Sequence, residues 1–337
     1  MTPVGLRGGK GRSAKSAESS GRTKGAATKP GKTDPKVAKR LAPRPLPRDP
    51  DAGPDFFCVG AQKGGTRWLY DQLQLHPDFW MPPVKELHYF DRRAPAAASV
   101  NLLARAKENL GRTNRRQAKL ALRPLDQRDV DFLAAYIGMR WWLTDLDAYA
   151  RLFALKGGLL SGDITPDYSA LSERQIARIM RRFPRAKVVF IARDPVERAW
   201  SQLSMHMRRG TVARDVDPEA VMRQVRKRFV AARSYPAGIV TRWRRYVPEH
   251  QLGIYLFDDL LHDAHALRGR ILTFLGADPM KESGAIPAAF NRKQEKEKIL
   301  LPPALREHLA GHFAAELKTS GEAFGGAAKD WAARYGL

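Results

Sequence analysis

The chain has few of the features that mark secreted or membrane-spanning proteins. Its 337 residues include a single cysteine, Cys58, so no intramolecular disulfide can form and the cysteine content does not indicate a secreted scaffold. No apolar run approaches the about 20 residues that a membrane-spanning helix needs, and the first residues lack the apolar core of a secretory signal. These absences predict a cytoplasmic protein. Cys58 lies in an apolar run, which predicts a buried structural thiol.

Acidic residues are also scarce relative to basic ones. Lys and Arg number 59 and Asp and Glu 35, which gives a formal net charge of +24. Residues 1–50 hold 13 basic and 3 acidic side chains, and the remainder holds 46 and 32, so both parts are basic. Such an excess indicates an anionic partner. A nucleic-acid-binding protein is one alternative that this charge allows, but the sequence contains no DNA- or RNA-binding motif, and no specific nucleic acid is expected.

The first 52 residues lack aromatic side chains and have few large aliphatic ones. A segment of this composition cannot bury enough apolar surface to offset its ordering entropy, so residues 1–52 are predicted to be a disordered basic tail. The tail is either a solubilising extension or a contact to an anionic membrane surface or polymer, which would place the protein at the membrane periphery. Residues 53–337 are predicted to form one domain.

Strand patterns alternate with helix patterns along this domain. Buried-type strands at 56–60, 187–192 and 252–257 are each followed by a helical stretch, and 158–164 is a candidate fourth strand. Further helices are expected in 101–153, from Ser172 onward, and in 302–317. This alternation predicts an α/β fold, a single domain with a central parallel β-sheet flanked by helices.

A glycine-containing turn follows the first strand. It reads Gly60-Ala61-Gln62-Lys63-Gly64-Gly65-Thr66-Arg67 and leads into the helix at 66–75. Glycines let a backbone approach an anion, and a helix N-terminus offers free N–H groups and the positive end of its dipole. The turn therefore predicts a phosphate site, with an ordinary tight turn as the alternative. It is not a Walker A loop, because the lysine precedes both glycines.

A second candidate site follows the strand at 187–192. Arg193 ends the strand, and Asp194, Pro195 and Glu197 predict a helix start with a capping box. Ser201 lies eight residues after Arg193, about two helical turns on. A guanidinium with a nearby hydroxyl suits a phosphate dianion, and a merely capping arginine is the alternative. His206, further along this helix, is a candidate contact to a ligand or a structural histidine.

A candidate base lies in the segment Pro83–Asp91. Glu86 follows Lys85 there, and a carboxylate in a partly desolvated cleft has its pKa raised toward neutrality, as general base catalysis requires. In an extended segment adjacent side chains face opposite sides, so Lys85 and Glu86 are not expected to pair. An exposed Lys–Glu pair beside packed aromatic residues is the alternative.

Together these motifs resemble the sulfotransferases that use 3′-phosphoadenosine-5′-phosphosulfate, in their bacterial and heparan-sulfate-type carbohydrate branch. The resemblance implies a P-loop-like sulfotransferase fold and a donor site made by both motifs and a basic loop near Asn291. Arg67 stands where many family members have Thr or Ser. In the segment Gly162–Tyr168, Asp163 and Ile164 replace the Glu and Lys usual in the family. The donor-binding residues that the resemblance implies are Lys63, Gly64, Gly65, Thr66, Arg67, Arg193, Ser201, Arg292 and Lys293.

The activity implied by the resemblance is sulfuryl transfer to a hydroxyl or amine of a glycan, a glycolipid or a small molecule. Lys63 would stabilise the leaving phosphate, Glu86 would act as general base, and His206 would contact donor or acceptor. No metal is expected. The alternative enzyme is a P-loop-like nucleotide kinase or ATPase, because the strand ending before Asp258 is similar to a Walker B strand.

Overall fold

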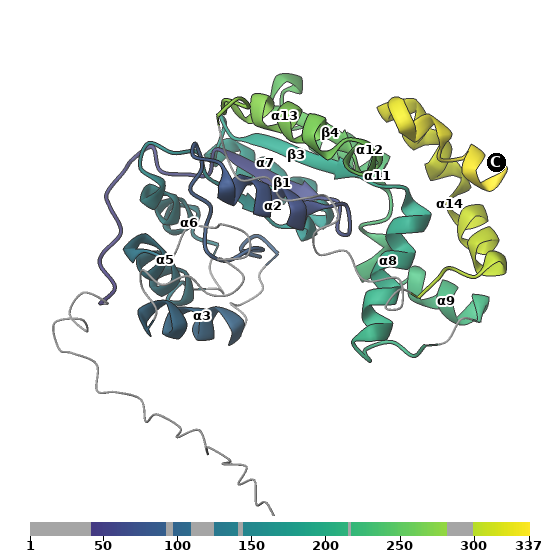
Figure 1. Ribbon diagram of the computed structural model, residues 1–337, viewed down its shortest axis with the longest axis horizontal. Helices are drawn as coiled ribbons and strands as arrows, with labels where there is room; N and C mark the ends of the chain where they lie inside the picture. Colours follow the sequence, from purple (N-terminus) through teal and green to yellow (C-terminus); the bar gives the residue numbers. More distant parts are fainter. Residues whose placement is uncertain (1–41, 92–96, 109–124, 141–143, 215–216, 282–298) are drawn as a thin grey trace, which may run out of the picture. The chain divides into compact units, whose positions relative to one another are not determined.

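The computed structural model describes residues 42–91, 97–108, 125–140, 144–214, 217–281 and 299–337. Within these residues four parallel strands form one sheet in the order β2-β1-β3-β4 (Figure 1). The strands are β1 (Phe56–Gly60), β2 (Gly162–Ile164), β3 (Lys187–Ala192) and β4 (Leu252–Leu256). Because all strands are parallel, their carboxyl ends meet at one edge, where ligands of open α/β sheets bind.

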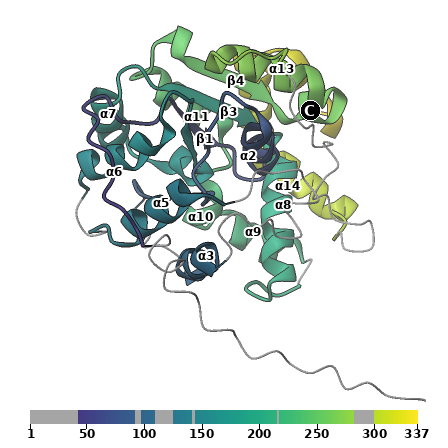
Figure 2. The same ribbon diagram turned by 60° about the vertical axis from the view of Figure 1, so that its left-hand side comes forward.

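Helices occupy most of the remaining described chain. They are α2 (Thr66–Leu75), α3 (Ala97–Glu108), α5 (Gln127–Ile137), α6 (Leu146–Leu152), α7 (Glu173–Arg182), α8 (Pro195–Arg208), α9 (Pro218–Val225), α10 (Arg228–Ala231), α11 (Pro236–Arg244), α12 (Phe257–His262), α13 (Ala264–Leu275) and α14 (Pro303–Phe324). Short 3₁₀ turns include η2 (Pro166–Ala170), η5 (Gly326–Asp330) and η6 (Ala333–Tyr335). Helix α14 packs against α8 and α9, and the three lie together in both ribbon views (Figures 1 and 2).

Both faces of the sheet are buried. Successive side chains of a strand point to opposite faces, so each strand contributes to the core on either side. Phe57 and Val59 of β1 belong to the large core that includes side chains of α7, α8, α11 and α14. Phe56 and Cys58 belong to a second core with α2 and α13. The α/β class and the parallel sheet expected from the sequence are thus confirmed. Cys58 is fully buried, and burial raises the pKa of its thiol to about 12, so it is an inert core residue.

Several element boundaries differ from those expected. The strand near residue 160 is limited to Gly162–Ile164, and the strand at 252 ends at Leu256 because α12 begins at Phe257. The last helix continues beyond Leu317 to Phe324. In 101–153 the described helices are α3, α5 and α6, and the rest of that range is described only in part.

The start of α8 is capped as predicted, with one exception. Asp194 accepts hydrogen bonds from the backbone N–H groups of Val196 (2.9 Å) and Glu197 (3.4 Å), and Pro195 opens the helix. The prediction of a capping box is wrong, however. The Glu197 carboxylate pairs with the Arg193 guanidinium at 3.5 Å instead of accepting from the backbone N–H of Asp194. The ion pair keeps Glu197 beside the candidate phosphate site.

Residues 42–52, which the sequence analysis assigns to the tail, make defined contacts with the domain. Arg44 donates from its backbone N–H and its Nε to the Asp131 carboxylate on α5, at 2.8 and 3.0 Å, and Ala52 is buried. Residues 1–41 lie outside the described residues, so the predicted disorder of the tail stays a prediction. In the described residues no helix is long and apolar enough to cross a membrane.

Candidate active site

The glycine turn between β1 and α2 has a backbone that only small residues permit. Gly65, the residue before α2, has a φ of +91°, in the left-handed region that glycine tolerates. A Cβ at Gly64 would lie 2.6 Å from the backbone oxygen of Ile191, so this position cannot carry a side chain. Within the part of the chain that the structure describes, no side chain caps the N-terminus of α2. The first N–H groups of α2 therefore remain available to an anion.

Lys63 of this turn is held in a strongly cationic setting. Burial lowers its pKa to about 8, and the neighbouring charges that lower it further are those of Arg193, Arg208, Arg209 and Arg198. Its Nζ lies 4.0 Å from the Met205 sulfur. Cations gathered in this way repel one another, and a bound anion would relieve the repulsion.

Arg193 joins the two predicted motifs. It donates a 2.8 Å hydrogen bond to the Lys63 backbone oxygen, and its guanidinium lies 4.4 Å from the centre of the Phe257 ring. Among the described residues, its buried Nε has no hydrogen-bond partner. A buried guanidinium with an unused donor costs free energy unless a ligand satisfies it. This unused donor fits the phosphate role predicted for Arg193.

Ser201 and His206 face the same cavity from α8. The His206 Nδ1 lies 2.9 Å from the Thr211 hydroxyl, and its ring packs on Phe229 with centroids 5.4 Å apart. Burial, Arg209 and Lys63 lower the pKa of His206, so the ring is neutral near pH 7. A neutral ring beside the cavity can exchange one hydrogen bond with a ligand, although its fixed contacts also serve the structure.

Glu86 and Lys85 form a close pair, and the expectation that they would not pair is wrong. The Lys85 Nζ lies 2.8 Å from the Glu86 Oε1. The segment is not extended here, because Glu86 has a φ of 72° and His88 a φ of 55°. Both conformations turn the chain so that neighbouring side chains meet at the cavity.

The pKa of Glu86 also differs from the expectation of a raised value. Burial raises it, but hydrogen bonds and charges from His88 and Lys85 outweigh burial and lower the pKa to about 2. Without ligands Glu86 is therefore a carboxylate at any physiological pH. It can accept a proton only as a weak base unless one of its two cationic neighbours is drawn away.

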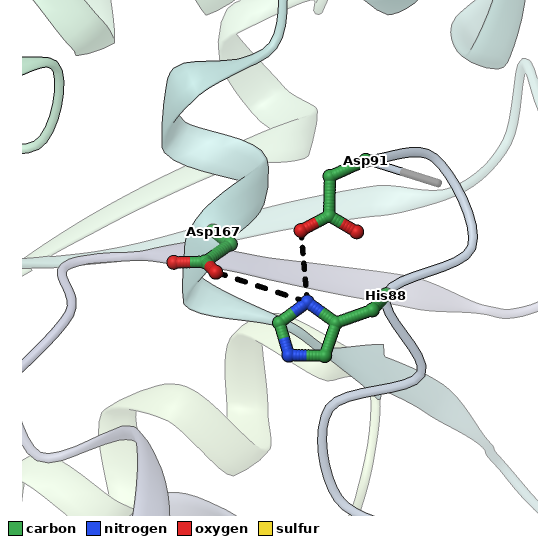
Figure 3. A group of neighbouring side chains, drawn as sticks. All are labelled: His88, Asp91 and Asp167. Carbon is green, nitrogen blue, oxygen red and sulfur yellow. Dashed lines mark hydrogen bonds and ion pairs between the residues drawn. The ribbon is translucent and has the colours of Figure 1, made fainter. Parts of the chain in front are cut away.

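His88 bridges several carboxylates beside Glu86. Its Nδ1 lies 2.8 Å from the Asp91 Oδ2 and 3.8 Å from the Asp167 Oδ2 (Figure 3). Its Nε2 lies 3.3 Å from the Glu86 Oε2. Burial lowers the pKa of His88, but the bonds to Asp91 and Glu86 prevail and raise it to about 9. The ligand atoms of His88, Asp91 and Asp167 lie within 4.8 Å of one another, close enough to hold a metal ion, which would have to displace the proton of the His88 ring.

Sequence reasoning missed His88, Asp167 and Arg233 as site residues. Arg233 donates from Nε to the Asp167 Oδ1 at 2.7 Å, and both side chains are buried at the cavity wall. The three residues come from separate segments of the chain, so no spacing reveals that they meet. The proximity of His88 to Glu86 in the sequence was the one available signal.

Asp163, from the segment that resembles the family, is not at the cavity. It is fully buried and accepts hydrogen bonds from Thr165 (2.6 Å), Tyr168 (2.7 Å) and Tyr149 (2.9 Å). Burial raises its pKa. These bonds give Asp163 a structural role in holding β2 and η2, and Asp167 is the acid of this segment that reaches the site.

The predicted site residues meet around one cavity of about 690 Å³ at the carboxyl edge of the sheet. Gly64 belongs to the glycine turn but does not line the cavity, and it packs against the Ile191 backbone. Asn291, Arg292 and Lys293 lie outside the described residues. The lining residues are Gln62, Lys63, Gly65, Thr66, Arg67, Lys85, Glu86, His88, Pro166, Asp167, Arg193, Ser201, Gln202, Met205, His206, Arg209, Phe229 and Arg233.

Asp258, the acid that a kinase or ATPase would use to bind magnesium, makes other contacts. Asp258 follows β4 but does not line the cavity. It accepts a 3.1 Å hydrogen bond from the Trp331 indole and pairs with Arg334. Its role is therefore structural, and the described residues offer no Walker-type magnesium ligand at this position.

A parallel α/β sheet with a glycine turn and clustered cations at its carboxyl edge is typical of proteins that bind phosphorylated ligands. The model of the sulfotransferase family matches residues 54–282, and the chain belongs to this family. No match was found among curated protein sequences.

A solved sulfotransferase structure shows the same fold. A sulfotransferase from Alicyclobacillus acidocaldarius is 23% identical with a TM-score of 0.54, over 80% of this chain and 95% of that one. The sulfotransferase domain of the Synechococcus PCC 7002 olefin synthase is 20% identical with a TM-score of 0.46, over 80% of this chain and 97% of that one.

Proposed function

We propose that the protein transfers a sulfuryl group from 3′-phosphoadenosine-5′-phosphosulfate to a hydroxyl or amine of an acceptor. Membership of the sulfotransferase family supports this activity. The observation that carries the proposal is the buried Nε of Arg193, which has no partner among the described residues. It lies at a cavity that also contains Lys63, Ser201 and a helix N-terminus that no described side chain caps. These groups fit a donor with phosphates at both ends of its ribose.

The residues divide into two groups with different tasks. The N–H groups at the start of α2, with Lys63, Gly65, Thr66 and Arg67, would hold the phosphosulfate. Arg193 and Ser201 would hold the 3′-phosphate, which distinguishes the donor from ATP. When bound, the donor supplies the sulfuryl group, and Lys63 stabilises the negative charge that grows on the departing phosphate.

Glu86 would accept the proton of the acceptor. In the described state Lys85 and His88 hold it as a weak base. If Lys85 turns to an anionic ligand in the cavity, Glu86 loses a cation and its pKa rises, so the base becomes stronger when the ligands are present. His88, fixed by Asp91, would keep the carboxylate oriented.

For the acceptor we propose a glycan or glycolipid. The lining side chains are mostly charged or polar, and the apolar ones are limited to residues such as Pro166, Met205 and Phe229. A polyhydroxylated acceptor suits such a wall better than a flat apolar one. The basic segment 1–52 would hold the protein at an anionic membrane surface or polymer, and cysteine usage supports a cytoplasmic location.

A radiolabelled sulfate-transfer assay tests this function. The purified protein is incubated with labelled donor and a panel of glycans, glycolipids, amines and phenols. We expect label in a hydroxyl- or amine-bearing glycan or glycolipid. Transfer to phenols alone would contradict the acceptor class, and transfer to none, with magnesium-dependent ATP hydrolysis by the same preparation, would contradict the activity itself.

A further inference from the structure

The segment after α14 contacts the residues that follow two neighbouring strands. The Tyr335 hydroxyl donates a 2.8 Å hydrogen bond to the Asp194 Oδ2, directly after β3. Trp331 and Arg334 both bind the Asp258 carboxylate, close after β4. Trp331 is fully buried in the core, so this segment is a packed part of the domain.

Asp194 and Asp258 are both neighbours of cavity residues, although neither lines the cavity itself. Asp194 follows Arg193 in the chain, and Asp258 follows Phe257, whose ring lies against the Arg193 guanidinium. Burial lowers the pKa of Arg193, and the negative charges of Glu197, Asp194 and Asp258 act in the opposite direction.

A carboxylate that competed for Arg193 would occupy the donor group that a phosphate needs. Asp194 is instead held by Tyr335 and by two backbone N–H groups of α8. Asp258 is held by Trp331 and Arg334. Both aspartates are thus bound to other partners. The acid that pairs with Arg193 is Glu197, 3.5 Å from its Nη2, and this pair leaves the Arg193 Nε without a partner among the described residues.

We propose that Tyr335 and Arg334 are positioning residues for donor recognition: they hold Asp194 and Asp258 so that Arg193 stays available to the 3′-phosphate. This inference rests on the proposed function. Loss of the Tyr335 hydroxyl leaves the Asp194 Oδ2 without that hydrogen bond. The negative charge of this carboxylate, on the residue next to Arg193 in the chain, then competes with the phosphate.

The test is the affinity of Tyr335→Phe for adenosine 3′,5′-bisphosphate and for adenosine 5′-monophosphate, measured by calorimetry on the full chain. We expect binding of the bisphosphate to weaken about tenfold and binding of the monophosphate by less than about twofold. The matched control is Tyr246→Phe, because Tyr246 also donates to a carboxylate, Glu173, at 3.0 Å but away from the cavity. It should bind both nucleotides like the unchanged protein.

A positioning role changes the ratio of the two affinities. A merely structural role would lower the melting temperature without changing that ratio. Arg334→Gln, at a side chain that is 37% exposed, gives a second variant that leaves the core intact and should change the ratio in the same direction. An unchanged ratio in both variants overturns the inference. A ratio near one in the unchanged protein would instead contradict the proposed donor.

Discussion

Glu86→Gln tests the proposed base directly. The amide keeps the size of the side chain. Lys85 and His88 lie 2.8 and 3.3 Å from different carboxylate oxygens, so the single amide oxygen can keep one of these two hydrogen bonds. It cannot take a proton at physiological pH. Affinity for the donor should therefore survive, while turnover falls.

The size of the fall follows from the basicity of the carboxylate. General base catalysis contributes about 10²–10⁴-fold to a rate, and a weaker base contributes less. Because the pKa of Glu86 is lowered to about 2 in the ligand-free state, we expect a loss near the lower end of that range, about 10²-fold in kcat. A larger loss would mean that ligand binding strengthens the base, as movement of Lys85 would do.

The assay is steady-state sulfate transfer with saturating donor and acceptor. Glu173→Gln is the matched control, because Glu173 on α7 is also bound by an arginine and a tyrosine hydroxyl but lies outside the cavity. It should turn over at the unchanged rate. If Glu86→Gln also kept the full kcat, the reasoning would be refuted, and His206 would be the next candidate base.

Three further predictions concern charge and domain limits. Lys63→Ala should lower kcat by about 10²-fold. In the unchanged protein, kcat/KM for the donor should fall as pH rises through about 8, the pKa of Lys63. Full turnover of the variant at saturating donor would exclude this role of Lys63. The pKa of His88 is raised from 6.5, its unfolded value, to about 9 in the folded protein. The protonated ring therefore contributes its full share to the stability of the fold below pH 6.5, and this contribution is lost as pH rises through 9. Urea unfolding should therefore show His88→Gln less stable by on the order of 2–3 kcal/mol at pH 6 and little changed by pH 10, and a difference independent of pH would contradict this linkage. Deletion of residues 1–40, which precede the Arg44 contact, should leave the melting temperature unchanged; a marked drop would make that segment structural.

The parts of the fold that local sequence determines were predicted well. The apolar run at β1 and the glycine turn after it define a strand and a loop, and Asp194 with Pro195 fixes the start of α8. Such features depend on residues close together in the chain, where periodicity and capping rules apply. The position of Lys63, Arg193 and Ser201 at one cavity could be predicted because each follows or lies near such an element, and their roles stay predictions.

The contacts that tune the site could not be predicted. The left-handed backbone at Glu86 and His88 has no sequence signature in residues other than glycine, yet it brings Lys85 onto Glu86 and reverses the expected pKa shift. The meeting of Asp167 with Arg233 depends on how separate segments pack. The prediction that Glu197 completes a capping box was wrong for a similar reason, because the Glu197 carboxylate forms an ion pair with Arg193.

Recognition of the 3′-phosphate is the central claim, and calorimetry on the unchanged protein tests it most directly. Arg193, whose Nε has no partner among the described residues, and Ser201 both line the cavity, and the proposal assigns that phosphate to them. Loss of a buried charge-paired contact costs about 2–5 kcal/mol, so adenosine 3′,5′-bisphosphate should bind at least about 30-fold more tightly than adenosine 5′-monophosphate. Equal affinities for the two nucleotides would contradict the assignment of this cavity as a sulfotransferase donor site.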